Sequence, residues 1–278
     1  MRESEKVKSS DEGKRILKQA YKEAKLTQDE LAKQANTSID TVKRLLGTKE
    51  CPNGVERWAV KNIVKVLNEK GVSIKAIDIL NPEDWYRQQI PTEFERLIKD
   101  KTEFFSGRKF VFNAIQEFIK NNPNGYFTVI GDAGMGKSAI AAKYVLDHPG
   151  TVCFFNIRAE GMNRPDLFLR KIREQVINIY QLTNVEDADL STLLVEATKQ
   201  LPMGENLVIV VDALDEVEQE STGNLLYLPT IIPDGVYFLL TRRPYHEADK
   251  RLSFSPSVAT KELDLREKNQ ESIQDIKG

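Results

Sequence analysis

The sequence predicts an α/β fold, a parallel sheet flanked by helices, preceded by a small all-α region. Three observations support this class. The front third carries short amphipathic helical stretches, and the remainder alternates apolar runs with helical stretches. A glycine-rich segment separates the first of these runs from the next helix, which is typical of a loop that a ligand approaches closely.

Helical periodicity dominates the front of the chain. Apolar residues recur at helical spacing from Glu12 to Ala24, and the pattern returns in LTQDELAKQA behind Thr27, a good N-cap. A third helix is expected behind Thr37 and Ser38, from about Ile39 to Leu46, and a fourth in VERWAVKNIVKVLNEKG, which ends at Gly71. The segment therefore predicts an all-helical domain.

Two prolines, Pro82 and Pro91, interrupt the chain after these helices. We place a domain boundary near residue 82, so that residues 1–82 form the helical domain and residues 83–104 a linker. Trp85 and Phe94 are the apolar side chains with which this linker would dock.

Four continuous apolar runs follow, and each is short enough to be a strand buried on both faces of a parallel sheet. They cover residues 126–130, 151–156, 206–212 and 236–241. Helical stretches lie between them, so the sheet should be parallel with helical crossovers.

Composition narrows the class of protein. The chain has 278 residues, 40% hydrophobic and 29% charged, and its longest apolar runs are far shorter than the roughly 20 residues of a membrane span. Two cysteines and two histidines are too few for a disulfide framework or a zinc site. We expect a cytoplasmic protein without a membrane partner.

Charge is unevenly distributed along the chain. Residues 1–80 carry 17 lysines and arginines against 12 aspartates and glutamates, whereas the remainder carries 23 against 30. This asymmetry is compatible with a nucleic-acid contact by the first domain, although solvated lysines on helix faces are the commoner explanation.

The segment GDAGMGKS, between a predicted strand and a predicted helix, satisfies the phosphate-loop pattern G-x-x-x-x-G-K-[ST]. Glycines let backbone N–H groups turn toward a phosphate, a lysine reaches the outer phosphates, and a serine hydroxyl can hold magnesium. The predicted nucleotide-binding residues are Gly131, Asp132, Ala133, Gly134, Met135, Gly136, Lys137, Ser138 and Ala139.

A second acidic motif, LVIVVDALDEV, lies downstream of the loop. Asp212 ends a buried aliphatic run 75 positions after Lys137, where its carboxylate can hold magnesium together with Ser138. Asp215 and Glu216 follow, and a carboxylate there could orient or deprotonate an attacking water.

The next predicted strand ends in FLLTRRP, which brings Thr241, Arg242 and Arg243 to the edge where a γ-phosphate would lie. An arginine there can detect the terminal phosphate through a charge-assisted bidentate bond. Lys137, Asp212, Asp215, Glu216 and Arg243 are thus the candidate catalytic residues.

Residues 105–265 resemble the nucleotide-binding domain of the signal-transduction ATPases with numerous domains, the class of P-loop NTPases that includes the NACHT proteins. FSGRKFVFNAI resembles the lead-in helix of that family, and the resemblance implies that Arg108 lies near the nucleotide base and ribose. VVDALDE is similar to the NACHT signature, and LLTRRP resembles the sensor segment, which assigns the sensor role to Arg243.

The chain also departs from that family. Ala213 stands where a glycine usually follows the first acid, and residues 266–278 resemble only the entrance to the helical lid. The family's winged-helix domain, its histidine contact to phosphate and its C-terminal sensor repeats have no counterpart here, so the chain is expected to be a fragment or a truncated product.

The helical front contains a helix-turn-helix pattern in TQDELAKQANTSIDTVKRLL. Ala32 is small where the two helices would touch, and Asn36 tolerates the left-handed turn conformation. Helical adaptor domains share this pattern, so both DNA binding and protein binding stay open. The residues that would face duplex DNA are Ile39, Asp40, Thr41, Lys43, Arg44 and Lys49.

Together these motifs predict a magnesium-dependent switch that binds ATP or ADP, hydrolyses ATP slowly, and self-associates in the ATP state. Three alternatives remain: an ATP-regulated transcription factor, a helix-turn-helix used as an adaptor in a defence or signalling complex, and a metabolic kinase. The kinase is the weakest, because no further polar constellation follows Arg243.

Overall fold

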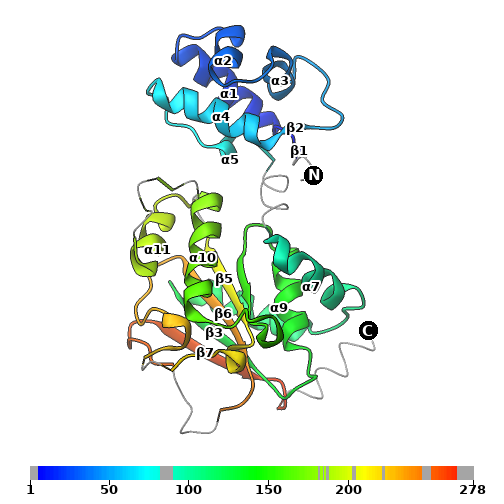
Figure 1. The fold of residues 1–278 in the computed structure, drawn as a ribbon, viewed down its shortest axis with the longest axis vertical. Coiled ribbons are helices and arrows are strands. Elements are labelled where there is room, and N and C mark those ends of the chain that lie inside the picture. The colour runs from blue at the N-terminus through cyan, green and yellow to red at the C-terminus, as the bar shows by residue number, and fades with distance from the viewer. Residues whose placement is uncertain are drawn as a thin grey trace. The chain divides into compact units, whose positions relative to one another are not determined.

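The computed structural model describes residues 6–81, 90–180, 182–183, 185, 188–201, 205–220, 223–245 and 252–267. The chain divides into two units, Met1–Gln89 and Ile90–Gly278, each with its own internal packing (Figure 1). The first is a helical region, and the second holds a five-stranded parallel sheet flanked by helices. The predicted α/β class, with a helical region in front of the sheet, is confirmed.

Two helices of the first unit begin at capping residues that the sequence indicated. Thr27 forms a capping box with Glu30, whose backbone N–H donates to the Thr27 hydroxyl, and Ser38 accepts from the backbone N–H of Thr41. The elements are β1 (Lys6–Val7), α1 (Asp11–Glu23), α2 (Gln28–Gln34), α3 (Ile39–Leu45), β2 (Val55–Glu56), α4 (Arg57–Glu69) and α5 (Ala76–Ile79).

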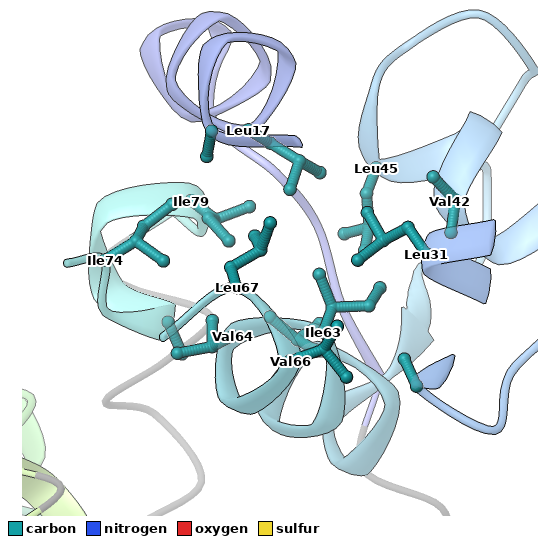
Figure 2. Close-up of a cluster of buried hydrophobic side chains, with 14 of the residues drawn as sticks. Leu17, Leu31, Val42, Leu45, Ile63, Val64, Val66, Leu67, Ile74 and Ile79 are labelled. Atoms are coloured by element: carbon teal, nitrogen blue, oxygen red, sulfur yellow. The ribbon is translucent and has the colours of Figure 1, made fainter. Parts of the chain in front are cut away.

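One apolar cluster joins these helices. Side chains from α1 to α5 converge in it (Figure 2), and it includes Leu17, Leu31, Val42, Leu45, Ile63, Leu67 and Ile79, all at most 1% exposed. Helix α1 approaches α5 so closely that a Cβ at Gly13 would lie 1.8 Å from the Ile79 carbonyl oxygen. Glycine is therefore required at this crossing.

The sequence predicted an all-helical first unit, and this prediction is wrong in one respect, because the unit also contains two short strands. Val55 and Glu56 form β2, which pairs antiparallel with β1, and the fourth helix begins only at Arg57. Val7 and Val55 pair and are both buried. The reason is tertiary, because the partner strand lies almost fifty residues earlier in the chain and adds nothing to the local periodicity around Val55.

The second unit alternates strands and helices, with short 3₁₀ helices (η) after the strands. Its elements are α7 (Thr92–Thr102), α8 (Lys109–Asn121), β3 (Gly125–Ile130), α9 (Lys137–Asp147), β4 (Val152–Phe155), η1 (Arg158–Glu160), α10 (Pro165–Tyr180), α11 (Leu190–Thr198), β5 (Leu207–Asp212), η2 (Leu214–Glu216), η3 (Leu225–Tyr227), β6 (Val236–Arg242) and β7 (Ala259–Asp264).

The strand order is β4-β5-β6-β3-β7, and every neighbouring pair is parallel. Figure 1 shows α10 and α11 on one side of these strands and α7 and α9 on the other. All carboxyl ends therefore meet at one edge of the sheet, and β6 lies between the strand that precedes the phosphate loop and the strand that ends in Asp212. Ligands of such sheets bind at this edge.

Four strands match the predicted runs, but β7 was not predicted. It pairs only with β3, at an edge of the sheet, and Lys261 and Glu262 are exposed on it. An edge strand does not need the continuous apolar composition of a buried one, so a search for apolar runs misses it.

Part of the segment predicted as a linker is the helix α7, which packs within the second unit. The Phe94 ring is fully buried and lies 5.8 Å from Phe154 and 5.3 Å from Phe155, both on β4. Glu93 makes an ion pair with Lys171 of α10 at 2.7 Å. Phe94 thus docks as expected, while Trp85 lies outside the described residues. No helix in the described part of the chain is long and apolar enough to span a membrane.

Candidate functional site

The glycine-rich segment forms an open loop between β3 and α9. Gly134 and Gly136 have φ of 81° and 83°, a left-handed conformation that favours glycine, and no atom lies within 4 Å of where their Cβ atoms would be. Asp132, Ala133, Gly134 and Gly136 are exposed. The loop therefore presents its backbone to the outside at the start of an eleven-residue helix.

Lys137 folds back over this loop. Its Nζ donates to the carbonyl oxygens of Gly131 at 2.7 Å and Asp132 at 2.9 Å. Burial lowers the pKa of Lys137, whereas the nearby carboxylates of Asp215 and Asp212 act in the opposite direction. The ammonium group is thus fixed between the loop and the acids that follow β5.

Asp212 connects the loop to the strand ends. The residue is 3% exposed, and its carboxylate accepts a hydrogen bond from the Thr241 hydroxyl. Burial raises the pKa of Asp212, and the hydroxyls of Thr241 and Ser138 oppose the rise. Ser138, far from Asp212 in sequence, therefore lies near its carboxylate at the carboxyl edge.

This pair fits the requirement of a magnesium ion. Magnesium takes oxygen ligands and is usually held by one or two protein groups, with water and substrate phosphates completing the coordination. One hydroxyl and one carboxylate near each other, beside a loop of exposed residues, are such a donor set. Within the described ranges, no group of three or more histidine, cysteine, aspartate or glutamate side chains could hold a metal by itself.

Ala213, directly after Asp212, has a left-handed backbone. Its φ is 55°, in the left-handed region, and its backbone N–H donates to the Thr241 hydroxyl at 2.9 Å. Thr241 thus binds both Asp212 and the residue after it. The sequence placed Thr241 at this edge but did not indicate that it organises the acidic segment.

The two acids after Ala213 diverge. Asp215 contacts Arg243 twice: its Oδ1 accepts from the Arg243 backbone N–H at 2.9 Å, and its Oδ2 lies 3.0 Å from Nε. Glu216 instead accepts from the backbone N–H of Arg158 at 3.1 Å, after β4. Its own carbonyl accepts from Asn163 at 2.9 Å.

The two neighbouring arginines also differ. Arg242 is 5% exposed and pairs with Glu262 of β7 at 2.8 Å, and its guanidinium lies 4.1 Å from the centre of the Tyr245 ring. The Arg243 side chain is 55% exposed and turns toward Asp215. Arg242 ends β6 and contacts β7, whereas Arg243 follows the strand and contacts Asp215, so Arg243 is the arginine associated with the acidic segment.

Arg108 lies against the phosphate loop. Its Nη2 donates to the Met135 carbonyl at 3.0 Å, and its backbone is left-handed, with φ of 65°, at the start of α8. The resemblance placed this arginine near a base and ribose. The described contact is with the backbone of the loop itself.

Asn156 is a residue of this edge that the sequence did not single out. It follows β4, is 4% exposed, and donates through Nδ2 to the Asp212 carbonyl at 2.6 Å. An asparagine after an apolar strand carries no pattern of its own. Only the pairing of β4 with β5 brings it to Asp212.

In the first unit, a short turn joins α2 to α3, and the two helices pack on each other. Asn36 has φ of 51°, as predicted for the turn, and Ala32 is 2% exposed where α2 packs on α3. Of the candidate DNA-contact residues, Lys49 is exposed, and the remaining five are partly exposed: Ile39, Asp40, Thr41, Lys43 and Arg44. The helix thus presents the expected residues on its surface.

The negative charge of Asp40 on that surface is neutralised by Lys49. Its carboxylate lies 2.5 Å from Lys49 Nζ. This hydrogen bond lowers the pKa of Asp40, and the charges of Arg44 and Lys43 act in the same direction. Lys49 is consequently engaged with Asp40, which leaves Lys43 and Arg44 as the stronger candidates for phosphate contact.

No protein-family model matches this chain, and no curated protein sequence matches it. Any assignment of function must therefore follow from the residues and the geometry described above.

Proposed function

We propose that the chain is a magnesium-dependent, ATP-binding switch of the NACHT-like class, with slow hydrolysis and an N-terminal helix-turn-helix. The observation that carries the proposal is the position of an open glycine loop, with Lys137 folded over it, beside the buried Asp212 at the carboxyl edge of a parallel sheet. A metabolic kinase would share the loop, but it is the weakest alternative, because no further polar constellation follows Arg243 in the sequence.

Each group has a role in such a site. The amides of Gly134 to Gly136 and the start of α9 would bind phosphate oxygens, and Lys137 would exchange its carbonyl partners for the outer phosphates. Ser138 and Asp212 would hold magnesium, which would neutralise phosphate charge when bound.

The acids after β5 would orient or deprotonate the attacking water, and Arg243 would detect the terminal phosphate. Loss of the terminal phosphate would remove a partner of Arg243 and shift the protein between two arrangements, one of which self-associates. This step of the proposal rests on the family resemblance of the acidic and sensor segments.

Lys137→Ala tests the proposal. Loss of the Lys137 ammonium should weaken binding of magnesium-ATP at least a hundredfold while the fold is retained, because this cation is fixed over the loop. Lys143→Ala, on the same helix, should bind normally, since Lys143 pairs with Asp147. Titration calorimetry of both variants decides the matter, and near-native affinity of Lys137→Ala would refute the loop assignment.

The nucleotide carried by the purified protein gives a second measurement. ADP released by heating would support a switch held in its resting form, and a purified protein that binds neither ATP nor ADP would contradict the proposed function.

For the first unit, we propose binding of duplex DNA through α3. The left-handed turn at Asn36 and the pairing of Asp40 with Lys49 support this reading, because the pairing offsets the one negative charge among the predicted contact residues. The alternatives are an ATP-regulated transcription factor, in which nucleotide controls this binding, and a protein adaptor, in which α3 meets another helical domain.

A further inference from the structure

The ion pair between Asp215 and Arg243 joins two strand ends of the proposed site. Asp215 lies in η2 after β5, and Arg243 follows the last residue of β6. Both carboxylate oxygens of Asp215 are engaged by the same residue, one by the Arg243 backbone N–H at 2.9 Å and the other by Nε at 3.0 Å. Such a two-point contact fixes the direction of the side chain as well as its distance.

The pair lies next to the phosphate loop. The charges of Asp215 and Arg243 both act on Lys137, together with those of Asp212 and Asp132. The Arg243 side chain is nevertheless 55% exposed, so a ligand on the loop can reach it. Arginine carries five N–H donors, and a contact through Nε leaves the terminal Nη groups available for the fork that matches a phosphate.

Glu216 does not share this arrangement. Its carboxylate accepts from the Arg158 backbone, on the side of β4, so the two adjacent acids contact opposite neighbours of β5. A common role in water activation therefore does not follow from their adjacency in sequence.

We propose that Asp215 is a positioning residue for Arg243: it holds the guanidinium beside the phosphate loop, so that Arg243 distinguishes a nucleoside triphosphate from a diphosphate. This inference rests on the proposed nucleotide-binding function. It assigns Asp215 to nucleotide discrimination and leaves water activation to Glu216.

Asp215→Asn is the decisive substitution, because it removes the charge while keeping an oxygen for the Arg243 backbone N–H. The measurement is the ratio of the affinities for a non-hydrolysable ATP analogue and for ADP, with magnesium, on the full chain. We expect Asp215→Asn to reduce this preference for the triphosphate about tenfold, and Arg243→Ala to reduce it at least as much. Glu220→Gln, a matched loss of an exposed acid on the same segment, should leave the ratio unchanged.

The double variant separates positioning from other roles. If Asp215 acts through Arg243, Asp215→Asn should change the ratio no further in the Arg243→Ala background. An unchanged ratio in Asp215→Asn, with slower turnover, would overturn the inference in favour of water activation. An equal additional loss in the Arg243→Ala background would also overturn it, because Asp215 would then act independently.

Failure of the inference about Asp215 can be distinguished from failure of the proposed nucleotide-binding function. If neither nucleotide binds the unmodified chain, the nucleotide site itself is refuted. If both bind and Lys137→Ala abolishes binding, only the role of Asp215 is at issue. Thermal unfolding of each variant, compared with the unmodified chain, identifies any loss of affinity that is due to loss of the fold.

Discussion

The two units carry their candidate sites in different ways. In the first unit, the residues proposed to meet DNA lie within eleven consecutive positions, 39–49, on α3 and the turn after it. In the second, the residues that meet at the sheet edge come from five separate segments, the ends of β3, β4, β5 and β6 and the start of α8.

The consequence concerns how much each site depends on its fold. A binding surface on one short helix requires only that the buried face of the helix is packed, so that its other face is exposed. The apolar cluster of the first unit provides this packing. A site assembled from strand ends needs the whole sheet in register, because the contacts of Asp212 with Thr241 and with Asn156 cross between strands. Single substitutions should therefore affect the two sites differently.

The largest expected effect is on turnover at the sheet edge. Glu216→Gln should slow ATP hydrolysis about a hundredfold, the range in which removal of a general base acts, and leave ATP affinity within about threefold. A steady-state phosphate-release assay beside a binding titration measures both. Glu220→Gln is the matched control, and unchanged turnover in Glu216→Gln would remove this acid from the mechanism.

The next effect tests whether the core of the first unit supports its own site. Ile63 is fully buried in the apolar cluster (Figure 2), and Ile63→Ala should lower the free energy of unfolding of that unit by about 2–5 kcal/mol. Hydrogen exchange on the full chain should show faster exchange within residues 6–81 and unchanged protection within residues 90–267. Equal loss of protection in both ranges would contradict the independence of the two cores.

A smaller effect is expected at the surface of α3. Arg44→Glu should weaken duplex DNA binding about tenfold at low salt, for all sequences alike, and reduce the salt dependence, because neutralised phosphates release counterions. Lys18→Glu makes the same charge change on the exposed face of α1 and should have little effect.

Thr41→Ala should change the sequence preference of DNA binding more than its affinity. Absence of duplex binding by the unmodified chain at low salt would favour the adaptor alternative.

The smallest effect concerns backbone strain at the sheet edge. Ala213→Gly should stabilise the second unit by roughly 0.5 kcal/mol, since glycine adopts a positive φ without the strain of a Cβ but gives up more entropy on folding. Ala142→Gly, in the interior of α9, should destabilise it by about 1 kcal/mol or more. Thermal unfolding of both variants gives the comparison, and destabilisation by Ala213→Gly would mean that strain at this position is negligible.

The site could be predicted from the sequence wherever its chemistry depends on neighbouring residues. The phosphate-loop pattern follows from three glycines within the six residues before Lys137, and the buried strand before Asp212 is a continuous apolar run. The turn at Asn36 and the caps at Thr27 and Ser38 are likewise local, because a cap or a left-handed residue acts within three or four positions.

Other features had no local signal. The pairing of β1 with β2 and the edge strand β7 depend on partners distant in sequence, and the roles of Asn156 and Thr241 depend on which strands are neighbours. The different partners of Asp215 and Glu216 also follow from the strand order, which places β6 on one side of β5 and β4 on the other.

The sequence by itself thus determined the fold class, most helices and strands, and the residue types at the candidate sites. These depend on periodicity, capping and turn chemistry, which act over a few residues. The tertiary structure alone decided which groups meet: Thr241 with Asp212, Arg243 with Asp215, and Glu216 with the backbone of Arg158. The physical reason is that hydrogen bonds and ion pairs act over about 3 Å, and only the registered sheet brings residues so far apart in sequence within that distance.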